Sequence, residues 1–180
     1  QQFQSAYQTT PTTQSVVKAL ASFQRTLISG DSRFDQYYYQ GNTTALNASE
    51  VAGMELFFGE EVGCANCHSG FLLTKQSFQN IGLYETYEDE GRARLTDNPA
   101  DVGKFKVPSL RNVAVTAPYM HNGSLQTLEE VVDHFNEGGV GHENQSALVQ
   151  PLGLNEQERA DLVNFLGTLT DESFINNAEF

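Results

Sequence analysis

The stretch GCANCHSG, residues 63–70, holds both cysteines of this 180-residue chain. Cys64 and Cys67 are three residues apart, and His68 follows directly. C-x-x-C-H is the pattern of covalent c-type haem attachment. Two thiols at this spacing can reach the two vinyl groups on one edge of a porphyrin, and the imidazole of the next residue can then reach the iron. The motif therefore predicts one covalent haem c, bound by Cys64, Cys67 and His68.

Other uses of two cysteines explain the stretch less well. A thioredoxin-like redox site requires a strand–helix context, which the surrounding sequence does not offer. A zinc site needs more Cys or His ligands at suitable spacing, and only His121, His134 and His142 remain. A structural disulfide leaves His68 without a role. Haem is the interpretation that uses all three residues.

The charge balance argues against one class of partner. The chain has 10 Lys and Arg residues and 23 Asp and Glu residues, which gives a formal net charge of −13. Nucleic acid is not expected, because a phosphate backbone requires a basic footprint. A basic protein partner suits this charge, and so does a surface that keeps the chain soluble. No apolar run approaches the roughly 18–20 residues of a membrane span.

The start of the given sequence does not read as a secretory leader. A secretory leader would show a charged segment followed by an apolar one, and the opening QQFQSAYQTT does not. Because it also lacks a Met, we expect a processed, trimmed or excerpted polypeptide.

The apolar pattern predicts an all-α fold with long loops and little or no sheet. In residues 15–29, an apolar stripe precedes Gly30 as a stop signal. Ser49 is the expected cap of a helix over EVAGMELFFGE. Residues 60–107 read as a long loop, which is unusual in a compact domain unless a bound group organises it. An embedded haem would supply that organisation.

Two further helices follow the loop. Thr127 to Glu130, TLEE, is a predicted capping box, and Gly138 closes the helix that it opens. Asn155 and Glu158 give a similar signal for EQERADLVNFLGTL. Residues 30–48 are interpreted as a connector.

Several segments resemble one family when they are taken together with CANCHSG. They are FQNIGL, GRARLT, GKFKVPSLRNVAVTAPYMHNGSLQTLEEVV and PLGLNEQERADLVNFLGTLTD. The chain resembles, over roughly residues 15–171, the C-terminal haem domain of the bacterial dihaem cytochrome c peroxidase and MauG family. The resemblance is specific, because VPSLRNVAVTAPYMHNGS is not general cytochrome sequence.

The resemblance implies a division into two parts. Residues 1–48 are similar to the end of the family's N-terminal haem domain, and residues 49–180 are expected to form a cytochrome c-type domain around one haem. The family carries two haem motifs, whereas this chain has one. The peroxide-reacting haem is therefore expected on a missing segment or on another chain.

The second axial ligand of the iron is open at this level. By chemistry alone Met120, Met54 and the histidines compete; Met54 fits the core better, and a thioether from Met120 would raise the potential. In the family the resemblance implies a Met or Tyr ligand from the following helix, at a position occupied here by Phe135, which cannot bind iron. The alternatives are Met120, His134, or an open iron shielded by Phe135. Equally, His134 could face solvent while Met120 packs against the ring edge.

Other candidate binding residues surround the motif. Arg111 and, with less support, Arg92 could pair with a haem propionate, since guanidinium binds carboxylate in a bidentate manner; ordinary surface pairing is the alternative. The resemblance implies that backbone carbonyls of Thr116 and Pro118 contribute to a Ca²⁺ site between the two haems.

The resemblance also implies a function. The expected role is to pass electrons from a small donor, a cytochrome c or a cupredoxin, to a second haem that reduces hydrogen peroxide. The chain alone is then expected to transfer electrons only. The alternatives are a stand-alone mono-haem carrier or electron-transfer subunit, a MauG-like oxidation of a partner protein, and an open haem that is itself reactive. Thioether attachment implies the periplasm or another compartment outside the bacterial cytoplasm, and a homodimer is an open alternative.

Overall fold

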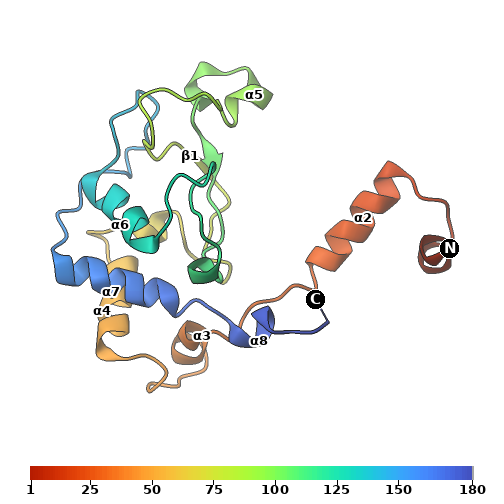
Figure 1. The fold of residues 1–180 in the computed structure, drawn as a ribbon, viewed down its shortest axis with the longest axis horizontal. Helices are drawn as coiled ribbons and strands as arrows, with labels where there is room; N and C mark the ends of the chain where they lie inside the picture. The colour runs from red at the N-terminus through yellow and green to blue at the C-terminus, as the bar shows by residue number, and fades with distance from the viewer. Residues whose placement is uncertain (180) are drawn as a thin grey trace.

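The body of the protein is built around two crossing helices, α4 and α7, in a computed structural model that describes residues 1–179 (Figure 1). The predicted all-α fold is confirmed, since the sheet in the described residues consists of two strands of two residues each. The elements are α1 (Gln2–Tyr7), α2 (Thr13–Gln24), α3 (Arg33–Tyr38), α4 (Ala48–Phe58), η1 (Cys64–Asn66), β1 (Phe78–Gln79), α5 (Ala93–Thr96), η2 (Pro99–Asp101), β2 (Phe105–Lys106), η3 (Val113–Val115), α6 (Leu128–Glu137), α7 (Glu156–Gly167) and α8 (Glu172–Ile175). None of the helices within residues 1–179 is long and apolar enough to cross a membrane.

A glycine allows α4 and α7 to pack at close range. A Cβ atom built on Gly53 of α4 would lie 1.9 Å from the backbone oxygen of Asp161 on α7. No side chain fits in that space, so the crossing depends on glycine at this position. A polar contact marks the same crossing, because the Ser49 hydroxyl donates to the Asp161 carboxylate.

The hydrophobic core surrounds this crossing and reaches α3 and α6. Its buried members are Phe34, Phe57, Leu73, Leu128, Val132, Leu162, Phe165, Leu166 and Leu169. Phe165 and Leu169 are fully buried. Burial of such side chains contributes about 1.5–3 kcal/mol each, so α6, α7 and the segment after the cysteine motif are held as one unit.

Helices α1 and α2 form an arm that projects away from the body (Figure 1). The structure has a helix close to the one predicted over residues 15–29, but α2 begins earlier, at Thr13, and ends earlier, at Gln24. The observed helix is therefore shorter than the predicted one. The Thr26 hydroxyl donates to the carbonyl of Phe23 at 2.7 Å, and a local bond of this kind competes with helix propagation. The expected apolar stripe is present but largely solvent-exposed; Leu20 has an exposed fraction of 57%.

The predicted connector over residues 30–48 contains a helix that the sequence interpretation missed. Helix α3 begins at a capping box in which Ser32 and Asp35 bond to each other's backbone N–H. Phe34 of α3 is in the core cluster. This part of residues 1–48 therefore packs into the body; the boundary at 48 remains a prediction.

The three predicted helix caps have different outcomes: the cap of α7 is confirmed, the cap of α6 differs in detail, and the cap predicted for α4 is wrong. Asn155 and Glu158 form the predicted reciprocal capping box. Thr127 accepts a hydrogen bond from the Glu130 N–H, but the Glu130 carboxylate accepts from the N–H of Gln126. Helix α4 is capped by Asn47 instead of Ser49, because Ser49 lies inside the helix and faces α7.

Residues 59–127 contain only short elements, as predicted for most of this stretch. Strands β1 and β2 pair antiparallel, with Phe78 opposite Lys106 and Gln79 opposite Phe105. The chain here folds over one side of α6 and α7 (Figure 1). The space between these loops and the helices is the candidate site.

Candidate haem site

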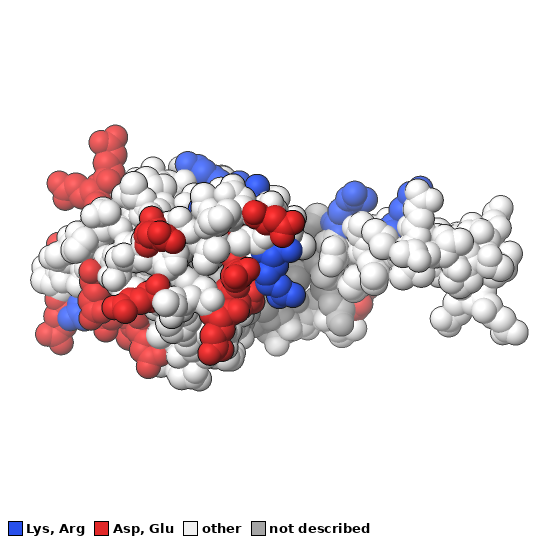
Figure 2. All heavy atoms as spheres, turned by 90° about the horizontal axis from the view of Figure 1, so that it is seen from above, with Lys and Arg blue, Asp and Glu red and all other residues white. Residues whose placement is uncertain are grey.

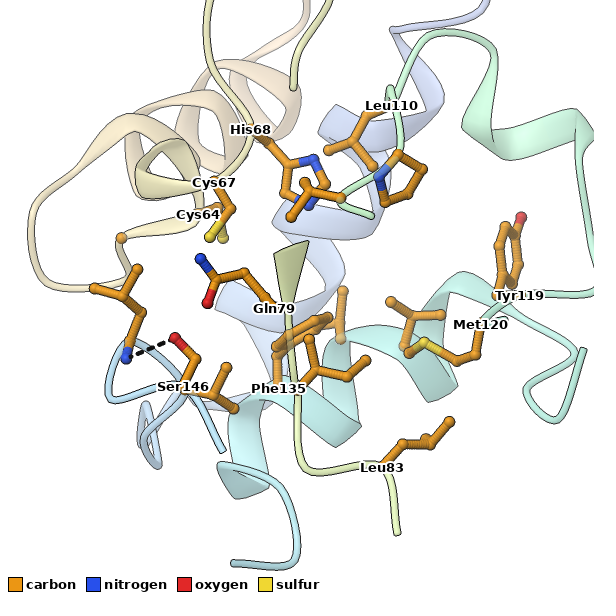
Figure 3. Close-up of a pocket in the computed structure, with 18 of the residues that line it drawn as sticks. Cys64, Cys67, His68, Gln79, Leu83, Leu110, Tyr119, Met120, Phe135 and Ser146 are labelled. Carbon is orange, nitrogen blue, oxygen red and sulfur yellow. Dashed lines mark hydrogen bonds between the residues drawn. The ribbon is translucent and has the colours of Figure 1, made fainter. Parts of the chain in front are cut away.

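The cysteine motif forms a tight turn at the entrance of this space. Gly63 has a φ of 68°, and a Cβ there would lie 2.8 Å from the Asn66 side-chain nitrogen. The N–H groups of Cys67 and His68 both donate to the carbonyl of Cys64, at 3.1 and 2.9 Å. The turn brings the two sulfur atoms together at the edge of the cavity (Figure 3).

Both thiols are free and protonated at neutral pH. Burial raises the pKa of the Cys64 thiol to about 11, and burial also raises the pKa of Cys67. Reactive or redox cysteines need the opposite, a lowered pKa that yields a thiolate. The raised pKa values therefore argue against a thiolate-based redox or nucleophilic role for this pair.

The His68 ring is fixed by the backbone, which leaves one nitrogen available. Its Nδ1 lies 3.1 Å from the carbonyl oxygen of Leu73, so Nδ1 carries the proton and Nε2 has a lone pair. Burial lowers the pKa of His68, and the carbonyls of Leu73 and Pro108 act in the opposite direction. A neutral, oriented imidazole is the form that ligates a metal.

The cavity is large and lined mainly by hydrocarbon. Its volume is about 390 Å³, within the range of about 300–1,000 Å³ that is typical of cofactor sites. The apolar lining includes Phe57, Val62, Ile81, Leu83, Phe105, Val107, Leu110, Val113, Leu128, Val131, Val132, Phe135, Leu148, Val149, Leu152, Leu162 and Leu166. Phe135 lies across the cavity from His68 (Figure 3).

The residues present fit a covalently bound haem. Two neutral thiols face one edge of the cavity, one imidazole offers a free Nε2, and the walls are apolar. A flat hydrophobic macrocycle with an iron at its centre requires this set of groups. Cys64, Cys67 and His68 would hold it.

Aromatic rings close one side of the cavity. His121 stacks on Phe105, with ring centroids 3.8 Å apart and an interplanar angle of 12°. The Tyr87 ring lies 6.1 Å from His121, and all three residues line the cavity. From the sequence, His121 is among the histidines that could ligate a metal, whereas Tyr87 and Phe105 are not predicted to line the site.

A buried asparagine supports this aromatic wall. Asn80 has no exposed surface, and its Oδ1 accepts from the Gly82 N–H and from the Tyr87 hydroxyl, at 2.8 and 3.1 Å. Its Nδ2 donates to the carbonyl of Val102 at 3.1 Å. Asn80 lies in FQNIGL between the polar Gln79 and the apolar Ile81, and this local pattern gives no signal that it is buried.

Comparison with known proteins places the chain in a family. A model described as cytochrome c matches residues 50–170, and a model described as di-haem cytochrome c peroxidase matches residues 1–44. The chain belongs to the di-haem cytochrome c peroxidase and MauG family. Its cytochrome c domain, like those of the family, is expected to bind haem c, and the fold is cytochrome c-like.

Relatives include both peroxidases and MauG proteins. The chain is 38% identical to cytochrome-c peroxidase IdrP1 of Pseudomonas sp. over 85% of its own length and 48% of the relative. It is 42% identical to the methylamine utilization protein MauG of Methylorubrum extorquens over 87% of its length and 44% of the relative. It thus spans about half the length of these family members.

A solved structure agrees with the fold over almost the whole chain. A MauG-like protein associated with microbial copper homeostasis superposes with a TM-score of 0.90 at 38% identity. The match covers 99% of this chain and 60% of that protein. The arm and the body therefore have the same arrangement in both molecules.

The two side chains proposed as the second iron ligand are Met120 and His134. Of these, only Met120 lines the cavity described above. Met120 enters from the side and has a φ of 71°. His134 lies outside the cavity, and its Nε2 donates to the carbonyl of Ile81 at 3.0 Å. Adjacent residues on a helix point about 100° apart, so a cavity-facing Phe135 directs His134 elsewhere.

The two arginines bind protein groups and do not line the cavity. The Arg111 guanidinium forms an ion pair with Asp35 and donates to the carbonyl of Phe71. Arg92 pairs with Asp101 at 3.2 Å and lies over the Phe78 ring. Contact of Arg111 or Arg92 with a haem propionate remains a prediction. In the structure each guanidinium is already paired with an aspartate.

The residues named for calcium lie on the surface. Thr116 and Pro118 are exposed, and the peptide bond between Ala117 and Pro118 is cis. Within residues 1–179, no cluster of three or more Asp, Glu, His or Cys side chains could hold a metal ion. A calcium site at this position of the family fold remains a prediction that rests on backbone carbonyls.

Proposed function

We propose that this chain is the electron-transfer haem domain of a di-haem cytochrome c peroxidase-like protein. It would accept electrons from a small donor protein and pass them to a second haem that reduces hydrogen peroxide. The observation that carries the proposal is the cavity itself: paired neutral thiols and an oriented imidazole stand opposite a wall of hydrocarbon. Haem c bound there would supply one-electron chemistry.

The wall opposite His68 supports electron transfer over peroxide chemistry at this site. Helix α6 contributes Leu128, Val131, Val132 and Phe135 to the cavity. Cleavage of a peroxide bond relies on a positioned group that moves protons, and these side chains have none. We further propose that Phe135 shields the iron and that no side chain of α6 ligates it; Met120 then packs beside the ring.

The remaining side chains position and insulate the group. The Leu73 carbonyl accepts the Nδ1 proton of His68, which leaves Nε2 free and would allow it to ligate the haem iron. The hydrocarbon lining excludes water from the space between α6 and the motif. A dry environment with little reorganisation suits rapid electron transfer and tunes the potential.

A second haem domain is the proposed partner for the arm. Val17 and Leu20 of α2 have exposed fractions of 58% and 57%, and residues 1–44 match the di-haem family model. An apolar helix face of this kind suits a covering domain better than solvent. This favours the two-haem protein over a stand-alone mono-haem carrier. Because thioether attachment of haem would take place outside the bacterial cytoplasm, we propose that the protein resides in the periplasm or in another compartment outside the cytoplasm.

MauG-like oxidation of a partner protein is a second candidate function. The TM-score of 0.90 to a MauG-like protein and the 42% identity to a MauG favour it. The two functions differ in product: one gives water from peroxide with a reduced donor, and the other gives a mass change on a partner protein.

The test of the main proposal compares two samples: the haem-loaded chain alone, and the full-length protein, meaning this chain joined to the proposed second haem domain. We expect the chain to take up one electron from a reduced cytochrome c and to show no peroxide turnover, while the full-length protein turns peroxide over. Rapid peroxide turnover by the chain alone would show that the reactive haem is this one.

A further inference from the structure

A second hollow lies on the outer side of α6, and it shares Leu83 with the lining of the haem cavity. Its lining includes Tyr84, Glu130, Asp133, His134 and Glu137. None of the described residues that line it is Lys or Arg. The hollow is open to solvent, so a side chain from another molecule can enter it.

The charges around the hollow are mostly uncompensated carboxylates. Asp133 is paired with Arg159, whereas Glu130 and Glu137 are exposed and have no Lys or Arg partner among the described ion pairs. The segment that follows Tyr84 adds four exposed carboxylates. They are Glu85, Glu88, Asp89 and Glu90, of which Asp89 pairs with Arg94 at 3.7 Å. On the face shown in Figure 2, acidic side chains gather over the body, whereas the arm shows basic ones.

Packed aromatic rings connect the hollow to the haem cavity. Tyr84 lines the hollow, and its ring lies 5.7 Å from Tyr87 and 6.3 Å from His121. Tyr87 and His121 line the cavity. The Tyr84 ring is held in place by its hydroxyl, which accepts from the Asn122 side chain at 2.8 Å. These rings thus form one packed path from the hollow to the haem cavity, beside Leu83, which lines both spaces.

We propose that this acidic hollow is the docking site of a basic electron-transfer protein, with Tyr84 at the contact. The proposal rests on the proposed function and names the partner class and the surface. A lysine or arginine of the partner would enter between Glu130 and Glu137, because opposite charges steer and align such complexes. One electron would pass from the reduced partner to the oxidised haem c held by Cys64, Cys67 and His68, with no bond formed or broken and no proton transferred.

Binding can be measured without turnover. The probe is a lysine-rich cytochrome c in which zinc replaces iron, so that it binds but does not exchange electrons in the dark. Its dissociation constant for the haem-loaded protein is measured by calorimetry at low ionic strength. The test variant is Glu130→Gln/Glu137→Gln, and the matched control is Glu55→Gln/Glu179→Gln, which removes the same charge from exposed positions on α4 and the C-terminal tail.

The two variants give opposite expectations. The test pair should weaken binding by about 3- to 10-fold, as expected for two exposed ion pairs, and added salt should abolish the difference. The control pair should stay within about twofold of wild type, the usual range for rim charges that make no contact. Equal weakening by both variants, or none by the test pair, would overturn the proposal.

A second variant separates the surface from its charge. Tyr84→Ala removes the ring while every carboxylate stays, and we expect it also to weaken binding of the zinc probe. Unchanged binding would remove Tyr84 from the contact. The haem spectrum of each variant monitors the cofactor site, so a failure of the proposed function would appear as a missing or altered haem, and a failure of the docking proposal as normal haem with unchanged binding.

Discussion

Arg111 and Asp35 form a buried ion pair, with 2.5 Å between Nη1 and Oδ2 and exposed side-chain fractions of 6% and 1%. The same guanidinium donates to the carbonyl of Phe71 from Nε and Nη2, at 2.9 and 2.7 Å. The pair therefore joins α3 to the segment just after the haem motif. Arg111 acts as a structural tie between residues that are far apart in the sequence.

Loss of this tie should destabilise the fold and leave the haem potential almost unchanged. Arg111→Leu leaves a buried carboxylate without its counter-charge, which costs about 3–5 kcal/mol in comparable pairs. Denaturant unfolding of the haem-loaded protein measures the loss, and a redox titration measures the potential. A large shift in potential with unchanged stability would instead assign Arg111 to a propionate.

The control for this prediction is an exposed pair. Arg94 and Asp89 are 3.7 Å apart, with exposed fractions of 69% and 50%. Arg94→Leu should change the free energy of unfolding by no more than about 1 kcal/mol, as is usual for surface ion pairs.

In the proposed haem site, the face of α6 opposite His68 would decide how the iron is coordinated. Because Phe135 cannot ligate iron, Phe135→Met should introduce a thioether ligand and raise the reduction potential. Met120→Leu should leave the optical and paramagnetic-resonance spectra of the oxidised protein unchanged. If Met120→Leu converts a six-coordinate spectrum into a five-coordinate one, then Met120 is the ligand and the shielding role of Phe135 is wrong.

Asp171 should contribute to stability above acidic pH. Burial acts to raise its pKa, but hydrogen bonds outweigh burial and lower the pKa from 3.8 to about 2. The donors are the Ser173 hydroxyl and the backbone N–H groups of Gly30, Asp31 and Phe174.

The direction with pH follows from the lowered pKa. The folded state favours the charged carboxylate, so the stabilisation is complete above the unfolded pKa of 3.8 and is lost as the pH falls toward 2. Asp171→Asn should cost about 2 kcal/mol near pH 6, and the difference from wild type should shrink toward zero near pH 2. Unfolding curves across this range check it, with Glu143→Gln as an exposed control; a constant difference would contradict the linkage.

Local spacing was sufficient to predict the haem motif, and helix periodicity was sufficient for α6 and α7. Cys64, Cys67 and His68 act together within one turn, so no distant residue is needed to recognise them. The all-α class followed because the helices carry capping signals such as Asn155 and Glu158.

Contacts between distant segments could not be read from spacing. Asp35 and Arg111 are 76 positions apart. No local sequence pattern indicates that a buried carboxylate in one segment forms an ion pair with an arginine in the other. The orientation of His134 and Phe135 also depends on how α6 rotates against the body, and a rotation of one residue exchanges the two. Ser32 and Asp35 did carry a readable capping signal for α3, which the connector interpretation overlooked.

The central claim is that Cys64, Cys67 and His68 hold one haem through two thioether bonds and an imidazole. Intact mass spectrometry of the denatured protein, combined with thiol titration, tests it most directly. The account predicts the mass of the polypeptide plus one haem and no titratable thiol. A colourless protein with the mass of the bare polypeptide and two titratable thiols, after production with haem-attachment machinery, would contradict it.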